Sequence, residues 1–253
     1  MKTVQIGKVN FGEGKPKICI PIMGSTFVEL EKEIEALKEL PFDMIEWRMD
    51  FFKDIFNSNK KREAVNMIRK RLNDTVLLAT FRTSKEGGQT YICKEDYVLL
   101  YKEIIDLKLV DIIDVELFTG EKEVKEILDY AHKHNVYVIM SNHDFKKTLT
   151  YEQIIDRLCS MQEYDADICK IALMPQNKED VLTLLKATKD MTEKYADRPI
   201  VSMSMSKKGL ISRIAGEVFG SCLTFGSASK ASAPGQINAR ELDTILEIIH
   251  HSI

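Results

Sequence analysis

The chain has 253 residues, with 36 Lys and Arg against 39 Asp and Glu, which gives a formal net charge of −3. Its 44% hydrophobic and 30% charged residues are typical of an ordinary globular protein, so extensive disorder is excluded. There is no basic excess to neutralise phosphates, and no apolar run reaches the roughly 20 residues that a bilayer span needs. We therefore expect neither nucleic acid nor a membrane as a partner.

The cysteines and the start of the chain bear on its location. The cysteine count is odd and no C-x-x-C pair occurs, so neither a disulfide framework nor a zinc site is expected. Residues 1–6 lack the apolar segment of an export signal. These features predict a cytoplasmic protein with reduced thiols at Cys19, Cys93, Cys159, Cys169 and Cys222.

Short apolar segments alternate with longer segments of helical period along most of the chain. Residues 4–11 come first, and their alternation around Gly7-Lys8 predicts a small hairpin. Helical stripes are expected at residues 27–40, 181–194 and 239–249. Strands are expected at residues 17–23, 42–48, 76–82, 111–117, 136–141, 167–173, 199–205 and 218–225.

This alternation predicts the fold class. Eight units of about 30 residues are typical of a (β/α)8 TIM barrel, in which parallel strands are surrounded by helices. An open doubly wound sheet alternates in the same way, but the chain contains no G-x-G-x-x-G motif. We therefore predict one barrel domain over residues 1–253, with the hairpin covering the bottom of the barrel.

Polar side chains at the carboxyl ends of the early strands are the first candidates for an active site, because barrel enzymes place their chemistry there. Glu46 and Arg48 end the second strand on a shared face. Arg82 ends the third strand, where its guanidinium suits an anion or a hydroxyl ligand. Glu86 lies in the next loop, beside a Gly pair. The structural alternatives are a surface ion pair between Glu46 and Arg48 and a solvated carboxylate at Glu86.

The fourth and fifth strands add carboxylates and an imidazole. Asp114 and Glu116 share one face of the fourth strand, and inward-facing carboxylates need cationic partners, which the arginine and lysine side chains of the same site could supply. His143 follows the fifth strand and so falls at the catalytic end. His132 and His134 precede that strand and so lie at the opposite end of the barrel, where no metal site is expected.

Lys170 in the middle of the sixth strand is the most informative residue. Lysine is rarely buried without a reason, and a central strand offers little room for its amine to reach solvent. A nucleophilic lysine must lose its proton, which desolvation and neighbouring cations favour. We expect Arg48, Arg82, Arg213 and His143 to supply that positive field. Schiff-base chemistry is the preferred interpretation over a structural lysine.

The last two loops complete the candidate site. Met203 and Met205 are expected to form apolar walls, and Arg213 follows on a helical segment. Residues 226–236 are mostly small, which is typical of a mobile lid over the catalytic face. A plain flexible loop is the structural alternative. Ser232 and Gln236 in this lid are placed to hydrogen-bond a ligand.

Seven segments spread over the whole chain carry a family resemblance. They are Glu46-Trp47-Arg48, Thr80-Phe81-Arg82 with residues 85–88, residues 114–120, residues 138–145, Lys170-Ile171-Ala172 with Met174-Pro175, residues 203–206 and residues 233–236. Together they make the chain resemble the type I 3-dehydroquinate dehydratases. One departure is Pro21 near the end of the first strand, where the family has a small hydroxyl residue, so a side-chain contact to substrate from this position is not expected.

The resemblance implies a cofactor-free and metal-free syn dehydration of 3-dehydroquinate to 3-dehydroshikimate by a homodimer. It implies that Lys170 forms an imine at the C3 ketone and that His143 removes the C2 proton and later protonates the departing C1 hydroxyl. Glu86 would orient His143. Substrate binding would fall to Glu46, Arg48, Arg82, Arg213, Ser232 and Gln236.

Two other functions remain open from the sequence. A class I aldolase also uses a lysine imine in a barrel, although most such enzymes bind sugar phosphates and the last loop offers no clear phosphate nest. A metabolite-binding barrel without catalysis has no use for a lysine buried at such cost.

Overall fold

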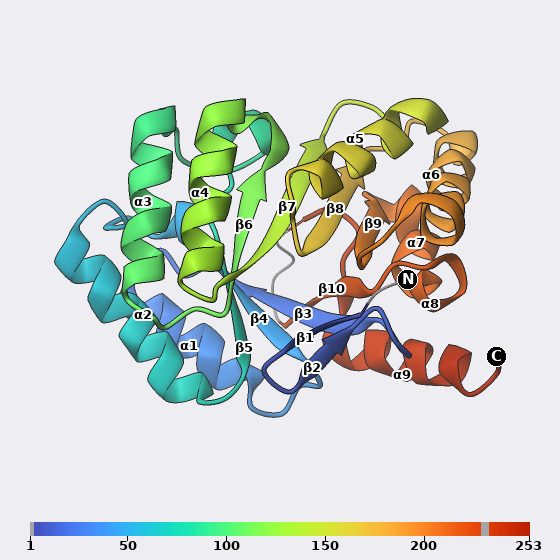
Figure 1. Ribbon diagram of the computed structural model, residues 1–253. Coiled ribbons are helices and arrows are strands. Elements are labelled where there is room, and N and C mark those ends of the chain that lie inside the picture. Colours follow the sequence, from blue (N-terminus) through green and yellow to red (C-terminus); the bar gives the residue numbers. More distant parts are fainter. Residues whose placement is uncertain (1–2, 229–232) are drawn as a thin grey trace.

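The computed structural model describes residues 3–228 and 233–253, and Figure 1 shows their arrangement. Parallel strands form a curled sheet in which each pairs with the next along the chain, and helices surround it. The strands are β3 (Lys17–Ile22), β4 (Met44–Arg48), β5 (Val76–Thr80), β6 (Ile112–Glu116), β7 (Tyr137–Asp144), β8 (Ile168–Leu173), β9 (Ile200–Ser204) and β10 (Leu223–Ser227).

The two ends of this sheet meet near the start of β10. Ile200 forms a parallel bridge with Ser221, and the Cys222 N–H donates to the Ile200 carbonyl at 2.9 Å. Farther along β10, the short strand β11 (Ile237–Asn238) pairs with it in parallel. The predicted (β/α)8 barrel is therefore confirmed, with β11 as an addition at the edge of β10.

The helices follow the strands in the expected order. They are α1 (Phe27–Leu37), α2 (Ser58–Leu72), α3 (Lys94–Asp106), α4 (Glu121–Lys133), α5 (Tyr151–Glu163), α6 (Lys178–Asp190), α7 (Leu210–Ile214), α8 (Gly216–Phe219) and α9 (Ala239–His250). Short turns of 3₁₀ or π geometry lie between elements: η1 (Met49–Phe51), η2 (Ser84–Glu86), η3 (Leu117–Thr119), η4 (Met191–Tyr195) and η5 (Lys207–Gly209). No helix in the described ranges is both long and apolar enough to span a membrane.

Side-chain caps define several helix starts. At the start of α5, the Thr150 hydroxyl accepts from the Gln153 N–H, and the Gln153 side chain accepts from the Thr150 N–H. This capping box satisfies two backbone donors that the first turn leaves without partners. At α6, Asn177 accepts from the Asp180 N–H, so this helix begins three residues before the predicted Val181.

Two strand predictions differ from the structure by three or more residues at one end, whereas the others agree to within two residues. The predicted strand 218–225 is wrong in its first half, because residues 216–219 form α8, which ends at Gly220 with φ +98. Glycine adopts this left-handed conformation at little cost and so ends a helix readily. Strand β7 is longer than predicted and extends to Asp144, because His143 and Asp144 stay in register with Ala172 and Leu173 of β8.

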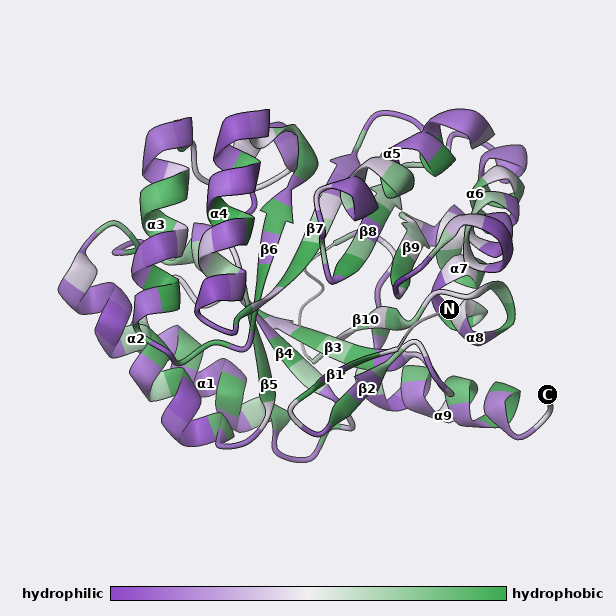
Figure 2. Ribbon diagram, viewed as in Figure 1, coloured by the Kyte–Doolittle hydropathy of each residue, from purple (hydrophilic) through white to green (hydrophobic). Residues whose placement is uncertain are grey.

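The core has two parts, divided by the sheet. Figure 2 shows apolar strands beneath helices whose outer faces are mostly hydrophilic. One cluster packs the helices against the outside of the sheet and includes Trp47, and the other fills the barrel interior. The hairpin of β1 (Val4–Ile6) and β2 (Val9–Phe11) packs Ile6 and Phe11 into the interior cluster, beside the first residues of several strands. The predicted hairpin is therefore confirmed.

Candidate active site

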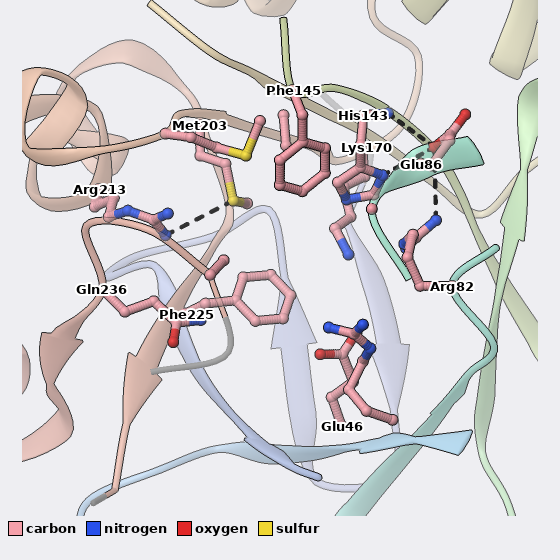
Figure 3. A pocket seen from close by; sticks show the side chains of 15 residues that line it. Glu46, Arg82, Glu86, His143, Phe145, Lys170, Met203, Arg213, Phe225 and Gln236 are labelled. Carbon is pink, nitrogen blue, oxygen red and sulfur yellow. Dashed lines mark hydrogen bonds and ion pairs between the residues drawn. The ribbon is translucent and has the colours of Figure 1, made fainter. Parts of the chain in front are cut away.

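A cavity of about 590 Å³, including its open mouth, lies at the carboxyl ends of the barrel strands. Figure 3 shows its lining side chains, which converge from strands and loops far apart in the sequence. Ser232 lies outside the described residues. The other residues predicted for the site all line this cavity: Glu46, Arg48, Arg82, Glu86, His143, Lys170, Arg213 and Gln236.

The Lys170 amine points into the cavity from the middle of β8 (Figure 3). The residue is 3% exposed, and its Nζ lies 4.7 Å from the centre of the Phe225 ring. Its one ion pair among the described residues is with Asp114 Oδ2, at 3.0 Å. The immediate partner of the amine is therefore a carboxylate that the sequence indicated would need a cation, and not one of the cations predicted to supply a positive field.

Asp114 is the centre of a buried network. Its Oδ1 accepts from Arg82 Nη2 at 2.7 Å and from the Ser141 hydroxyl at 2.5 Å. Burial opposes ionisation, but the charges of Arg82 and Lys170 outweigh it and lower the pKa of Asp114 well below its usual range. This carboxylate therefore stays ionised beside the amine.

Arg82 makes most of its contacts with this network and few with the cavity. Besides Asp114, its Nη1 contacts Glu116 Oε1 at 3.1 Å and the Ser141 hydroxyl at 2.9 Å. Glu116 also accepts from the N–H and hydroxyl of Thr83, at 2.8 Å and 2.7 Å. Arg82 lines the cavity as expected, but most of its donors already have partners.

His143, which is half-buried, and Glu86, which is buried, form a second pair that Figure 3 draws with dashed contacts. His143 Nδ1 lies 3.0 Å from Glu86 Oε2, and the same oxygen accepts from the His143 backbone N–H at 2.9 Å. Burial, together with the charges of Arg82 and Lys170, lowers the pKa of His143 well below its usual value. The imidazole is therefore neutral. With Nδ1–H donated to an ionised Glu86, its Nε2 can accept a proton.

Burial and the nearby Glu116 carboxylate raise the pKa of Glu86 to about 8. Arg82 and two hydrogen bonds oppose this rise, one of them from Asn142 Nδ2 to Glu86 Oε1 at 3.0 Å. Asn142 was not predicted, although its position next to His143 in β7 was a usable signal. Such a carboxyl group gains or loses its proton near neutral pH, as an acid–base partner requires.

Arg213 on α7 is a buried cation with no ion-pair partner among the residues described. Its Nη2 donates to the Pro234 carbonyl at 3.1 Å and Nη1 lies 3.8 Å from the Met203 sulfur, while Nε has no hydrogen-bond partner within the same part of the chain. Burial lowers the pKa of Arg213 to about 10. The arrangement is typical of a site for an anionic ligand, since an unpaired buried charge is otherwise costly.

Arg48 and Glu46 lie on the opposite wall. Arg48 makes a two-pronged ion pair with Asp50, with Nε and Nη2 at 2.8 Å and 2.9 Å from its carboxylate oxygens. Glu46 accepts from the Thr80 hydroxyl at 2.8 Å. Asp50 was not predicted, because nothing in the local pattern marks a carboxylate two residues past the strand as the partner that orients Arg48.

The remaining walls are apolar. Met203 and Met205 line the cavity, as the sequence predicted. Phe145 and Phe225 also line it and were not expected, because aromatic residues at these positions carry no local signal of ligand contact. Pro21 is buried in β3, in register with Glu46, and is not part of the cavity lining.

Metal ligands do not gather in the described part of the chain. No group of three or more His, Cys, Asp or Glu residues there could hold a metal ion. The His132 ring lies 3.1 Å from the Asp167 carboxylate, just before β8 and so at the end away from the cavity. The cavity thus brings together one amine, one imidazole–carboxyl pair and three buried guanidinium groups, of which that of Arg213 has no ion-pair partner in the described part of the chain.

Comparison with known proteins identifies the family. The model of the type I 3-dehydroquinase family matches residues 18–253. The 3-dehydroquinate dehydratase of Salmonella agona is 54% identical over 252 residues and covers 100% of both chains. A type I 3-dehydroquinate dehydratase from Clostridium difficile superposes with a TM-score of 0.97 at 50% identity, covering 100% of this chain and 99% of the other. The Enterococcus faecalis enzyme superposes with a TM-score of 0.91 at 39% identity, covering 97% and 98%. The chain therefore belongs to the type I 3-dehydroquinase family.

Proposed function

We propose that this chain dehydrates 3-dehydroquinate to 3-dehydroshikimate, the third step of the shikimate pathway, through an imine formed on Lys170. The observation that carries the proposal is the placement of one buried amine, Lys170, and one neutral imidazole, His143, in the same cavity as the buried cation Arg213. A small carboxylic acid that is also a ketone satisfies all three groups.

The chemistry begins at the ketone. The Lys170 ammonium beside Asp114 gives up one proton, and the freed amine attacks C3. That proton and one from the attacking nitrogen convert the ketone oxygen to water, which leaves, so the protonated imine carries the positive charge of the original ammonium. This cation takes the place of the ammonium beside Asp114, whose lowered pKa keeps it ionised as the counter-charge. The protonated imine draws electrons from the adjacent C2–H bond and so acidifies it.

His143 then acts twice. Its Nε2 removes the C2 proton, and the electron pair moves toward the imine nitrogen to give an enamine. The pair returns as the C1–oxygen bond breaks, and His143 delivers the proton to the departing hydroxyl, which leaves as water. Hydrolysis of the imine consumes one water and frees 3-dehydroshikimate, so the net change is the loss of one water from substrate.

The other site residues hold the substrate. Arg213 is assigned to the carboxylate, together with Gln236 and Ser232. Arg48 and Glu46 are assigned to the hydroxyls, since Asp50 holds the Arg48 guanidinium in place. Arg82 is assigned mainly to the Asp114 network, because its donors are largely engaged there.

Borohydride reduction in the presence of 3-dehydroquinate tests the amine. A reduced adduct is expected on the peptide that contains Lys170, in the wild type and in Lys147→Ala, whose lysine is exposed in the loop before α5. Lys170→Ala is expected to lose the adduct and turnover but to retain ligand binding. His143→Ala is expected to form the adduct and to stall at proton abstraction. An adduct on another peptide, or near-normal turnover of Lys170→Ala, would overturn the proposal.

A substrate panel separates the alternatives. Dehydration produces a conjugated enone whose ultraviolet absorbance grows with time, whereas an aldolase would instead cleave a sugar phosphate. A metabolite-binding barrel would take up 3-dehydroquinate without turnover. The proposal also includes a homodimer in the cytoplasm, for which sedimentation equilibrium and cell fractionation are the respective tests.

A further inference from the structure

A chain of contacts runs from the outside of the barrel to the carboxyl group beside the base. Arg157 on α5 donates through Nη1 to Asn142 Oδ1, and Asn142 Nδ2 donates to Glu86 Oε1 at 3.0 Å. The other Glu86 oxygen contacts His143 Nδ1. Asn142 is 3% exposed, and the Arg157 guanidinium lies 5.0 Å from the centre of the Phe118 ring. The imine mechanism gives no role to Asn142 or Arg157.

The chemistry of the two side chains gives this chain of contacts a direction. An amide can turn over and exchange its oxygen with its NH₂ group, whereas a guanidinium has only donors. Arg157 therefore holds the Asn142 oxygen toward itself and the NH₂ group toward Glu86. Without Arg157, the Asn142 amide could reverse and place its oxygen against the Glu86 carboxylate. Two oxygen acceptors repel each other, so this reversed orientation would favour the protonated form of Glu86.

The charge on Glu86 determines which nitrogen of His143 carries the proton. An ionised Glu86 accepts from Nδ1–H and leaves Nε2 as a base, whereas a protonated Glu86 donates to Nδ1 and forces the proton onto Nε2. The ionisable groups that face this carboxyl group include Glu116 from β6, Arg82 at 3.7 Å, His143 from β7 and Arg157 from α5. The Glu116 carboxylate opposes ionisation of Glu86, so hydrogen-bond donors to Glu86 are needed to offset this repulsion.

We propose that Asn142 and Arg157 are positioning residues that keep Glu86 ionised and oriented, so that His143 presents Nε2 as its basic nitrogen. This inference rests on the proposed function, because it concerns the base of the same reaction. Arg157 stacked on Phe118 anchors the amide from the helix layer. Neither side chain lines the cavity, so the pair acts through Glu86 and not on substrate.

The pH dependence of kcat/KM tests the pair. Arg157→Gln is expected to move the acidic limb of the profile to higher pH by about 0.4–1 pH unit, the effect of losing one net hydrogen bond to Glu86. The rate on the high-pH plateau and KM are expected to change less than about threefold, since Glu86 is ionised there in both proteins. Asn142→Asp, which places a carboxylate beside Glu86, is expected to shift the limb farther in the same direction.

Controls separate positioning from folding. Arg240→Gln removes a guanidinium on α9 that donates to the Glu39 carbonyl at 2.8 Å, and it is expected to leave the limb in place. Arg157→Lys is expected to restore the limb in part, and guanidinium chloride at low millimolar concentration is expected to restore it in Arg157→Ala. Rescue of this kind is not expected for a residue whose loss simply unfolds the barrel.

Nitrogen NMR of the imidazoles provides a readout that does not depend on turnover. In wild type, the proton of neutral His143 is expected to move from Nε2 to Nδ1 as pH rises, and in Arg157→Gln this change should occur at higher pH. A folded Arg157→Gln protein with an unmoved limb and an unmoved tautomer change would overturn the inference. Failure of the wild type to dehydrate 3-dehydroquinate would overturn the proposed function instead, and the NMR comparison would still decide the role of the pair.

Discussion

Replacing Arg213 with Met should make the protein more stable and a much weaker binder of its substrate. Burial lowers the pKa of this guanidinium from 12.5 to about 10, which corresponds to about 3 kcal/mol of destabilisation of the charged form at 1.36 kcal/mol per pKa unit. The hydrogen bond to the Pro234 carbonyl returns roughly 1.5 kcal/mol of that. Met has a similar length and packs beside Met203, so a net gain of about 1–2 kcal/mol is expected, or roughly 3–6 °C in Tm.

The sign of this effect does not change with pH near neutrality. Arg213 is charged in both the folded and the unfolded protein below pH 9, so the destabilisation is fully present there and fades only as pH rises through about 10. The stability difference between Arg213→Met and wild type should therefore be constant from pH 6 to 9.

Ligand binding should change in the opposite direction. Loss of a buried partner for the substrate carboxylate is expected to weaken binding by about 2–5 kcal/mol, which means an increase in Kd of roughly 30-fold to 5,000-fold. Differential scanning fluorimetry with and without 3-dehydroshikimate measures both effects on one sample. A variant that melts below wild type yet keeps its ligand-induced rise in Tm would show that Arg213 is structural, and the reasoning would be refuted.

Three further substitutions test the network around the amine. The Tm of Glu86→Gln relative to wild type should rise progressively from pH 5 to pH 9. The pKa of Glu86 is raised to about 8 in the folded protein, so the folded wild type loses stability as pH rises from the ordinary carboxyl pKa to about 8, whereas Gln does not ionise. A Tm difference that does not change with pH would contradict this. Asp114→Asn should destabilise the fold by about 3–5 kcal/mol in urea denaturation, because Arg82 and Lys170 lose their shared carboxylate. Gly87→Ala should lower the free energy of unfolding by about 1–2 kcal/mol, because Gly87 has φ +87, and should raise KM, because an added Cβ would lie 2.4 Å from the Phe145 ring that lines the cavity. An unchanged KM would show that the Phe145 ring moves aside without affecting substrate binding.

The period of two along each strand explains why the site residues could be predicted. In β8 it turns Lys170 inward with Ile168 and Ala172, and in β4 it does the same for Glu46 and Arg48. Once the barrel is recognised, the ends of the strands determine which polar residues meet. The order of strand and helix segments therefore carries most of the information about this site.

What could not be predicted depends on contacts between distant segments. The sequence indicated that Asp114 and Glu116 need cationic partners, but not that Arg82 would be the one whose donors they engage. The pairing of Arg157 with Asn142 depends on how α5 packs against β8, the strand beside β7, which no local period reveals. The eighth strand was placed too early, because the apolar pair Val218-Phe219 is compatible with either a strand or a helix until Gly216 and Gly220 are seen to bracket it.

The hairpin at the amino terminus has a consequence for how the chain folds. Ile6 and Phe11 precede all the barrel strands in the chain, yet the cluster that buries them draws on strands as late as β9 and β10. Their burial therefore requires contacts of very long sequence separation, which are slow to form. The hairpin therefore reaches its buried position only after β9 and β10 have joined the sheet, so the burial of Ile6 and Phe11 reports whether the barrel has closed.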